Sequence, residues 1–469
     1  MRARAALATL AAGLFALAGC GPAPVPRGPD ARLPGLAGTH VALPPMRRFA
    51  AGRASPPARS NRQMAQDFID LTFHLETGRD LPVLTRFEGP VTLALSGPVP
   101  ATAAADLGRV LARLRAEAGI DIARTDGPAA ITIEFLPRRT MRAQVPQAAC
   151  FVAPGVSSWG EYRRARADTL DWTRLSTRTR AAIFIPDDIA PQEVRDCLNE
   201  ELAQALGPLN DLFRLPDSVF NDDNIHGVLT GFDMLMLRVT YAPELQSGMG
   251  PEAVAAAVPG ILARLNPRGE RIGGAPTDPT PRAFVEAIDE ALGPGGRGMG
   301  ARRAAIGRAI DIAERRGWRD TRAGFAWLAL GRLSEVADPS AAYEAFSRAA
   351  AIYHADPGLA LQGAHADMEL AALALTQGQP AAVETLVAGA LPRAAAAENA
   401  ALLATLLMLR AEALQIEGQE SAAAAARLDS LGWARYGFGS DADVIGWMRG
   451  MAALNPVRGQ TPDRFASLQ

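Results

Sequence analysis

The chain has 469 residues and a formal net charge of −2, with 48% hydrophobic and 21% charged residues. At roughly 100–200 residues per domain this length corresponds to two or three domains, and the composition is that of a globular protein with a sizeable core. The near-neutral charge argues against nucleic acid as a partner, because a nucleic-acid-binding protein needs a strongly basic face.

The first 20 residues are typical of an export signal rather than of a folded element. Two arginines precede an apolar run over residues 5–18, which is the arrangement of a secretory signal peptide. The sequence Leu-Ala-Gly-Cys at 17–20 resembles the lipobox of bacterial lipoproteins, in which the cysteine becomes the lipidated N-terminus. We therefore expect Cys20 to be the lipidation site. The alternative is an ordinary signal peptide that ends near a chance cysteine.

Export sets further expectations about location. Residue 21 is Gly rather than Asp, which by resemblance to bacterial lipoproteins favours the outer membrane, with the protein facing the periplasm. No later apolar run reaches about 18 residues, so we expect no other membrane span. Residues 21–60 are rich in Pro and Gly, and we expect a semi-extended tether between the lipid anchor and the folded body.

The first folded domain is expected over residues 61–250. Hydrophobic periodicity predicts its helices and strands, which alternate and so indicate an α/β or α+β domain. The expected elements are a helix at 61–77, a strand at 91–95, a helix at 107–118, and strands at 131–135 and 182–185. Residues 137–180 show no clear period, and we expect an irregular region there.

Two cysteines remain after Cys20, namely Cys150 and Cys197. An exported chain is in an oxidising compartment, so an even pair of cysteines is most simply a disulfide. The chain-entropy model gives such a bond a stabilisation of about 4 kcal/mol. Two buried thiols are the alternative. A metal site would need further ligands, and no suitable histidine lies nearby in the sequence.

A helix that begins near Pro191 carries the most informative stretch of the chain, residues 199–211 (NEELAQALGPLND). Pro is favoured in the first turn of a helix, and Gly207 supplies a C-terminal cap. Glu201 falls inside the apolar stripe of this helix. A carboxylate at a core-facing position is costly unless it is paired or coordinated. Glu201 is therefore the first candidate for a functional residue.

The stretch resembles the active-site helix of zincin metalloproteases of the metzincin type, His-Glu-x-x-His-x-x-Gly-x-x-His or Asp. In that family two histidines one turn apart bind zinc, and the glutamate activates the bound water. On this pattern Glu201 takes the position of the general base, and Gly207 that of the turn glycine. The three ligand positions hold Glu200, Gln204 and Asn210 instead.

The resemblance continues downstream. Metzincin-like enzymes have a Ser-Ile-Met turn beneath the metal, then a helix that opens Leu-Thr-x-x-Asp and ends in Tyr. Here residues 218–221 (Ser-Val-Phe-Asn) and a helix over 229–241 follow in the same order, and Phe220 replaces the turn Met. The family therefore implies an α+β zincin-like fold for the N-terminal domain, with a degenerate active-site motif.

Residues 60–250 also resemble a bacterial family of unknown function, the domain-of-unknown-function family 2927. This resemblance implies a zincin-like fold and supplies no known activity. It rests on Cys197, residues 200–207, Asn210-Asp211, residues 218–222 and Gly248-Met249.

The departures from the zincin pattern argue against zinc, which prefers imidazole and thiolate ligands. We therefore expect no metal and no other cofactor. We interpret Glu201 as a structural residue that hydrogen-bonds Gln204, Asn210 or nearby backbone N–H groups, and we expect His226 to lie in a solvated loop. One alternative is a functional metal site built from Glu200, Gln204 and Asn210, with Glu201 as the general base. The others are a different chemical activity at this helix, or a chance similarity of the helix to zincins.

The C-terminal part is expected to be all-α. Residues 251–317 resemble connecting helices, with a hinge or domain boundary at 293–300. Over 318–455 an Ala- and Leu-rich pattern recurs, and Asp338, Gly378 and Gly418 mark equivalent turns. The first unit resembles a tetratricopeptide repeat with one residue fewer between its halves, so we expect tetratricopeptide-like helical repeats. A plain Ala-rich bundle is the alternative. Residues 456–469 would form a tail.

These features together predict an envelope-anchored periplasmic lipoprotein without catalytic activity. Its membrane contact would be the N-terminal lipid. A degenerate zincin-like domain would hold a protein or peptide partner in the former active-site cleft, and the repeats would offer a second concave surface. One alternative is a metal-dependent peptidase with atypical ligands. Another is an envelope assembly factor whose repeats alone carry the function.

Overall fold

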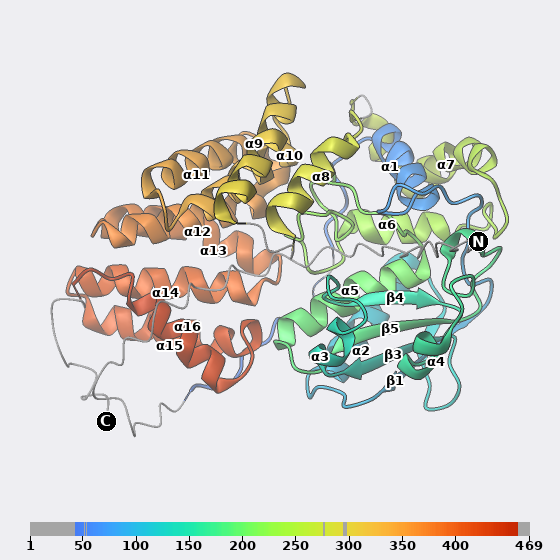
Figure 1. Cartoon of the computed structure of the whole chain (residues 1–469), viewed down its shortest axis with the longest axis horizontal. Coiled ribbons are helices and arrows are strands. Elements are labelled where there is room, and N and C mark those ends of the chain that lie inside the picture. The colour runs from blue at the N-terminus through green and yellow to red at the C-terminus, as the bar shows by residue number, and fades with distance from the viewer. Residues whose placement is uncertain (1–42, 51, 53, 275–276, 294–297, 458–469) are drawn as a thin grey trace, which may run out of the picture.

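The computed structural model describes residues 43–457 apart from 51, 53, 275–276 and 294–297, and these residues form an α/β region followed by an all-helical region (Figure 1). The expected signal peptide, the lipidation site Cys20 and the first part of the tether lie outside the described residues. So do most of the expected hinge and nearly all of the tail. None of the described helices is long and apolar enough to cross a membrane.

A five-stranded sheet with the strand order β2-β1-β3-β5-β4 forms the base of the α/β region. Four strands are parallel, and the edge strand β4 runs antiparallel to β5. The strands are β1 (Val91–Ser96), β2 (Ile122–Arg124), β3 (Ile131–Leu136), β4 (Phe151–Pro154) and β5 (Ala181–Pro186). The expected strands β1, β3 and β5 are confirmed. β4 was missed because all four of its residues are buried, so it shows no alternation of apolar and polar residues.

Helices cover both faces of this sheet. Alternate residues of β5 point to opposite faces, so Ile183 joins the core that contains α2 and α5, whereas Phe184 packs with α3 and α4. The helices of this region are α1 (Asn61–Phe73), α2 (Ala103–Arg113), α3 (Arg138–Arg142), α4 (Trp159–Arg164), α5 (Pro191–Leu206), α6 (Gly231–Thr240) and α7 (Pro251–Leu265).

Helix α5 begins at Pro191 as expected, and both of its ends are held by side chains. At the start, the Glu193 carboxylate accepts a hydrogen bond from the backbone N–H of Ala190 at 2.9 Å. At the end, the Arg178 guanidinium donates to the carbonyl oxygens of Gln204 (2.6 Å), Ala205 (2.8 Å) and Gly207 (2.5 Å). These bonds satisfy carbonyl groups that a helix terminus leaves without partners.

The boundary between the two regions falls between α7 and α8, so the expected set of connecting helices at 251–317 is divided. Val254 and Ile261 of α7 belong to the core of the α/β region. Helices α8 (Arg282–Leu292) and α9 (Met299–Arg315) pack instead with α10 in a separate cluster. The difference arises because the apolar faces of α7 and α8 are buried against different partners.

The helical region contains successive helix hairpins, as the sequence repeat predicts. Asp338 caps the N-terminus of α11, and Gly378 and Gly418 adopt positive φ angles of 66° and 74° in the turns before α13 and α15. The helices are α10 (Thr321–Ser334), α11 (Pro339–His354), α12 (Ala360–Thr376), α13 (Pro380–Ala396), α14 (Ala400–Ile416), α15 (Glu420–Gly437) and α16 (Asp441–Ala452).

The described residues between 43 and 60 differ from the expected tether, because they lie against the folded body. Phe49 stacks on Trp433 with ring centroids 4.4 Å apart, and Arg47 pairs with Asp429 at 2.6 Å. Arg109 of α2 donates a hydrogen bond to the carbonyl oxygen of Phe49 at 2.7 Å. This segment therefore contacts both the helical region and the α/β region.

Candidate functional site: a carboxyl-lined cavity along α5

A cavity of about 620 Å³ lies between the α/β region and the helical region. One face of α5 forms a wall, the edge strand β4 and the segment before it form another, and helices α12, α14 and α15 contribute from the opposite side. The residues of α5 that line the cavity recur at the spacing of one helix face and are Gln192, Glu193, Arg195, Asp196, Cys197, Glu200, Glu201 and Gln204.

Carboxyl groups from four separate segments gather near the C-terminal half of α5. Burial is the first cause that raises the pKa of each, and repulsion by neighbouring carboxylates contributes further. The members, here called the carboxyl cluster, are Glu76 after α1, Glu200 and Glu201 on α5, Asp211 after α5 and Asp222 before α6.

Glu201 is the most buried member of the carboxyl cluster, with 4% of its surface exposed. This confirms its expected position inside the apolar stripe. A hydrogen bond from the backbone of Val152 in β4 favours its ionised form, but burial and then Asp211 raise the pKa of Glu201 to about 8. Its Oε2 atom has no hydrogen-bond partner within the described part of the chain.

Asp211 is at the centre of the carboxyl cluster. Burial and then Glu200 raise its pKa well above the ordinary value, while hydrogen bonds with Glu76 and Gln204 act in the opposite direction. Of the partners expected for Glu201, a backbone N–H group is the one found, namely that of Val152, whereas Gln204 bonds to Asp211. Asp211 and Asp222 belong to segments that carried the family resemblance. Glu76, by contrast, had no signal in the sequence.

Asn210 is directed away from the cavity, unlike Glu200 and Gln204. Its Nδ2 atom donates to the carbonyl oxygen of Asp70 in α1 at 2.9 Å, and Asn210 is not among the cavity-lining residues. The loop after Gly207 is also tied to α1 by a bond from Leu209 N to Leu71 O at 3.2 Å. These contacts orient the loop so that Asp211, and not Asn210, faces α5.

His226 also differs from the expectation of a solvated loop residue. It is half-buried and lines the cavity, and its Nε2 atom lies 3.1 Å from the carbonyl oxygen of Pro216. Burial lowers the pKa of His226, which favours the neutral imidazole.

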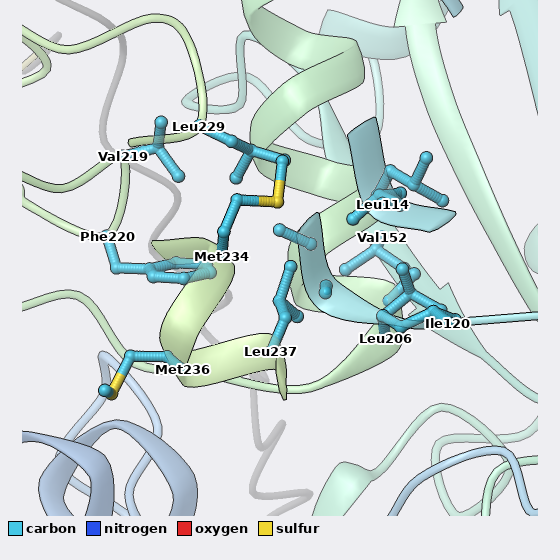
Figure 2. Packing of buried hydrophobic residues seen from close by; sticks show 14 of the residues in the cluster. Leu114, Ile120, Val152, Leu206, Val219, Phe220, Leu229, Met234, Met236 and Leu237 are labelled. Atoms are coloured by element: carbon cyan, nitrogen blue, oxygen red, sulfur yellow. The ribbon is translucent and has the colours of Figure 1, made fainter. Parts of the chain in front are cut away.

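The turn before α6 is fixed to α6 by hydrogen bonds and by apolar packing. Asp233 of α6 accepts hydrogen bonds from Ser218 Oγ at 2.5 Å and from the backbone N–H of Val219 at 3.2 Å. Phe220 is fully buried and lies toward Met234 of α6 (Figure 2). The sequence Leu-Thr-x-x-Asp thus has a structural role here, since its aspartate ties the turn to the helix.

The Cys150–Cys197 disulfide is confirmed, with a Cα–Cα distance of 6.1 Å. Both cysteines line the cavity. Cys197 lies one helical turn before Glu201, and Cys150 directly precedes β4. The bond therefore holds β4 beside α5, where Val152 can donate to Glu201.

The geometry does not fit the zinc ion that the zincin resemblance implies. No three His, Cys, Asp or Glu side chains among the described residues are arranged to hold a metal ion. The atypical ligand set Glu200, Gln204 and Asn210 is not assembled, because the Asn210 amide bonds to α1. What the cavity offers instead is a group of carboxyl oxygens that can exchange protons and bind a cation.

The fold is thus an α/β region with a small mixed sheet and one disulfide, joined to a helix-rich region. Residues 61–260 match the model of a family described as a protein of unknown function, DUF2927. This segment ends within α7 and contains every member of the carboxyl cluster. Searches of curated proteins and of solved structures found no match.

Proposed function

We propose that this protein is a non-catalytic binding protein of the bacterial cell envelope, and that its cavity takes a cationic group of a peptide or protein partner. The proposal depends on Glu201. This residue is 4% exposed, and its Oε2 atom has no hydrogen-bond partner among the described residues. A buried acceptor without a partner is destabilising, whereas an ammonium or guanidinium group would supply a charge-assisted hydrogen bond.

The other members of the carboxyl cluster strengthen this attraction. Asp211 is among the causes that raise the pKa of Glu76, Glu201 and Asp222, which means that ionised cluster members repel one another. A cation between them would reduce this repulsion and lower their pKa values. Binding is then accompanied by release of protons from the cluster.

The wider setting belongs to the same proposal. The segment 1–20 and Cys20 support export and lipidation, with the body facing the periplasm from the outer membrane. The motif with Glu201 and Gly207 supports descent of the α/β region from a zincin-like fold that no longer binds zinc. The tetratricopeptide-like repeats, as we interpret them, close the former cleft by packing beside α5.

Calorimetry with blocked peptides tests this proposal. The purified protein should bind acetyl-Lys-Ala-Ala-Ala-Gln-amide but not acetyl-Gln-Ala-Ala-Ala-Gln-amide. Glu201→Gln should weaken binding of the lysine peptide about tenfold, because a charge-assisted hydrogen bond is lost. Glu344→Gln is the matched control, since Glu344 is an exposed residue of α11. Equal binding of both peptides, or no effect of Glu201→Gln, would refute cation binding.

Glu201 occupies the position of the general base in the zincin motif, so a metal-dependent peptidase is the competing function. Metal analysis of the purified protein separates the two. Stoichiometric zinc that is lost in Glu200→Gln, together with cleavage of peptides, would establish the peptidase and exclude the binding protein proposed above.

A further inference from the structure

The cavity continues along α5 from the carboxyl cluster to a second charged region. Arg138 and Arg142 of α3 line it there, together with Glu193 from the first turn of α5. The backbone N–H of Arg138 donates to the Asp188 carboxylate at 2.9 Å, just before α5 begins. This arginine pair therefore lies at the N-terminal end of α5, whereas the carboxyl cluster lies near its C-terminal end.

The two charged regions are separated by about half the length of α5. Glu193 and Glu201 both line the cavity, and at about 1.5 Å of rise per residue they lie roughly 12 Å apart along the helix axis. An extended peptide advances about 3.3 Å per residue, so the four steps from its first to its fifth residue cover this length. Between the two ends the lining includes apolar residues and the Cys150–Cys197 disulfide.

The arginine pair is available to an anion. Arg142 is exposed, and its side chain forms no hydrogen bond or ion pair with another described residue. The guanidinium of Arg138 makes one long contact of 3.5 Å with the carbonyl oxygen of Asp188. Of the neighbouring acids, Glu193 accepts a hydrogen bond from the backbone N–H of Ala190, just before α5. Asp188 accepts one from the backbone N–H of Arg138 and does not line the cavity.

We propose that the ligand is an extended peptide of about five residues that lies along α5, with its cation at the carboxyl cluster and a carboxylate at Arg138 and Arg142. This inference rests on the proposed function and specifies its ligand. The charge distribution of the cavity selects a dipolar peptide whose two charges stand several residues apart. It discriminates against peptides whose opposite charges are adjacent.

Four blocked peptides compared by calorimetry test the inference. Acetyl-Lys-Ala-Ala-Ala-Glu-amide, or the reversed acetyl-Glu-Ala-Ala-Ala-Lys-amide, should bind about fivefold more tightly than acetyl-Lys-Ala-Ala-Ala-Gln-amide, as expected for one partly exposed ion pair. Acetyl-Lys-Glu-Ala-Ala-Ala-amide should show no such gain. In the double variant Arg138→Gln/Arg142→Gln the gain should disappear, while affinity for the glutamine peptide stays the same.

The control is Arg163→Gln, which removes an exposed arginine of α4 that does not line the cavity and should keep the fivefold preference. Urea titration of the double variant should show an unchanged midpoint, because Arg142 is exposed. If both five-residue dipolar peptides bind no better than the glutamine peptide, the inference is overturned and cation binding stands. If no lysine peptide binds, the proposed function falls and the inference with it.

Discussion

Glu201 occupies a position on α5 where helical periodicity alone would place an apolar side chain. At that position burial disfavours the charged carboxylate, and the nearby Asp211 adds repulsion. The disulfide holds β4 close enough for one backbone donor, Val152, to compensate in part. The ionisation of this single residue is thus set by a helix, an edge strand and a loop together.

Glu201 should make the stability of the ligand-free protein depend on pH. Because its pKa is about 8 in the native state and 4.5 ordinarily, the native state holds the proton more tightly than the unfolded state. Its stabilising contribution is present below pH 4.5 and is lost as the pH rises through 8. The free energy of unfolding of wild type should therefore fall over this range more than that of Glu201→Gln, by on the order of a few kcal/mol.

Urea titrations at several pH values measure this difference. Glu344→Gln should follow the wild-type curve, because its carboxylate is exposed in both states. Parallel curves for wild type and Glu201→Gln would show that Glu201 is ionised normally in the native protein.

Helix α5 illustrates which parts of an element are encoded locally. Pro191 at its start and Gly207 at its end are visible in the sequence. The donors that cap its C-terminus come from other elements. Arg178 lies before β5, and Tyr241 lies at the end of α6, where its hydroxyl donates to Leu206 O at 3.1 Å. These contacts determine where Gln204 and the following loop present their side chains.

Arg178→Ala should destabilise the protein by about 3 kcal/mol or more, because it leaves buried carbonyl groups of α5 without donors. The midpoint of urea unfolding measures this loss. Arg163→Ala, which removes an exposed arginine of α4, should have little effect. Similar midpoints for the two variants would mean that water replaces Arg178 at the end of α5.

The two regions of the molecule are joined by buried polar contacts, and their relative position defines the cavity. The Tyr436 hydroxyl of α15 donates to Asp106 of α2 at 3.0 Å, and both side chains are almost fully buried. At the start of α5, Gln192 accepts from Ala401 N at 3.0 Å, and Arg195 donates to Glu398 O at 2.7 Å. The helical region therefore closes the cavity that the α/β region begins.

Tyr436→Phe should loosen this junction. It removes the donor to a buried carboxylate, so we expect a loss of about 1–3 kcal/mol in the free energy of unfolding. Amide hydrogen exchange should become faster in α2 and α15. Tyr343→Phe is the control, because Tyr343 is 55% exposed on α11. Unchanged exchange in both helices would show that other contacts suffice to hold the junction.

Local patterns in the sequence determined much of this protein. Strands β1, β3 and β5, helix α5 with its buried Glu201, and the helix hairpins each follow from periodicity or from turn residues close in sequence. The Cys150–Cys197 pairing followed from the two cysteines that remain after Cys20 and from the expectation of export. The tertiary structure decided the site, because Glu76, Asp211 and Asp222 come from separate loops whose orientation depends on contacts with other elements. The bond from Asn210 to α1 is one such contact, and it brings Asp211 to the cavity in place of Asn210.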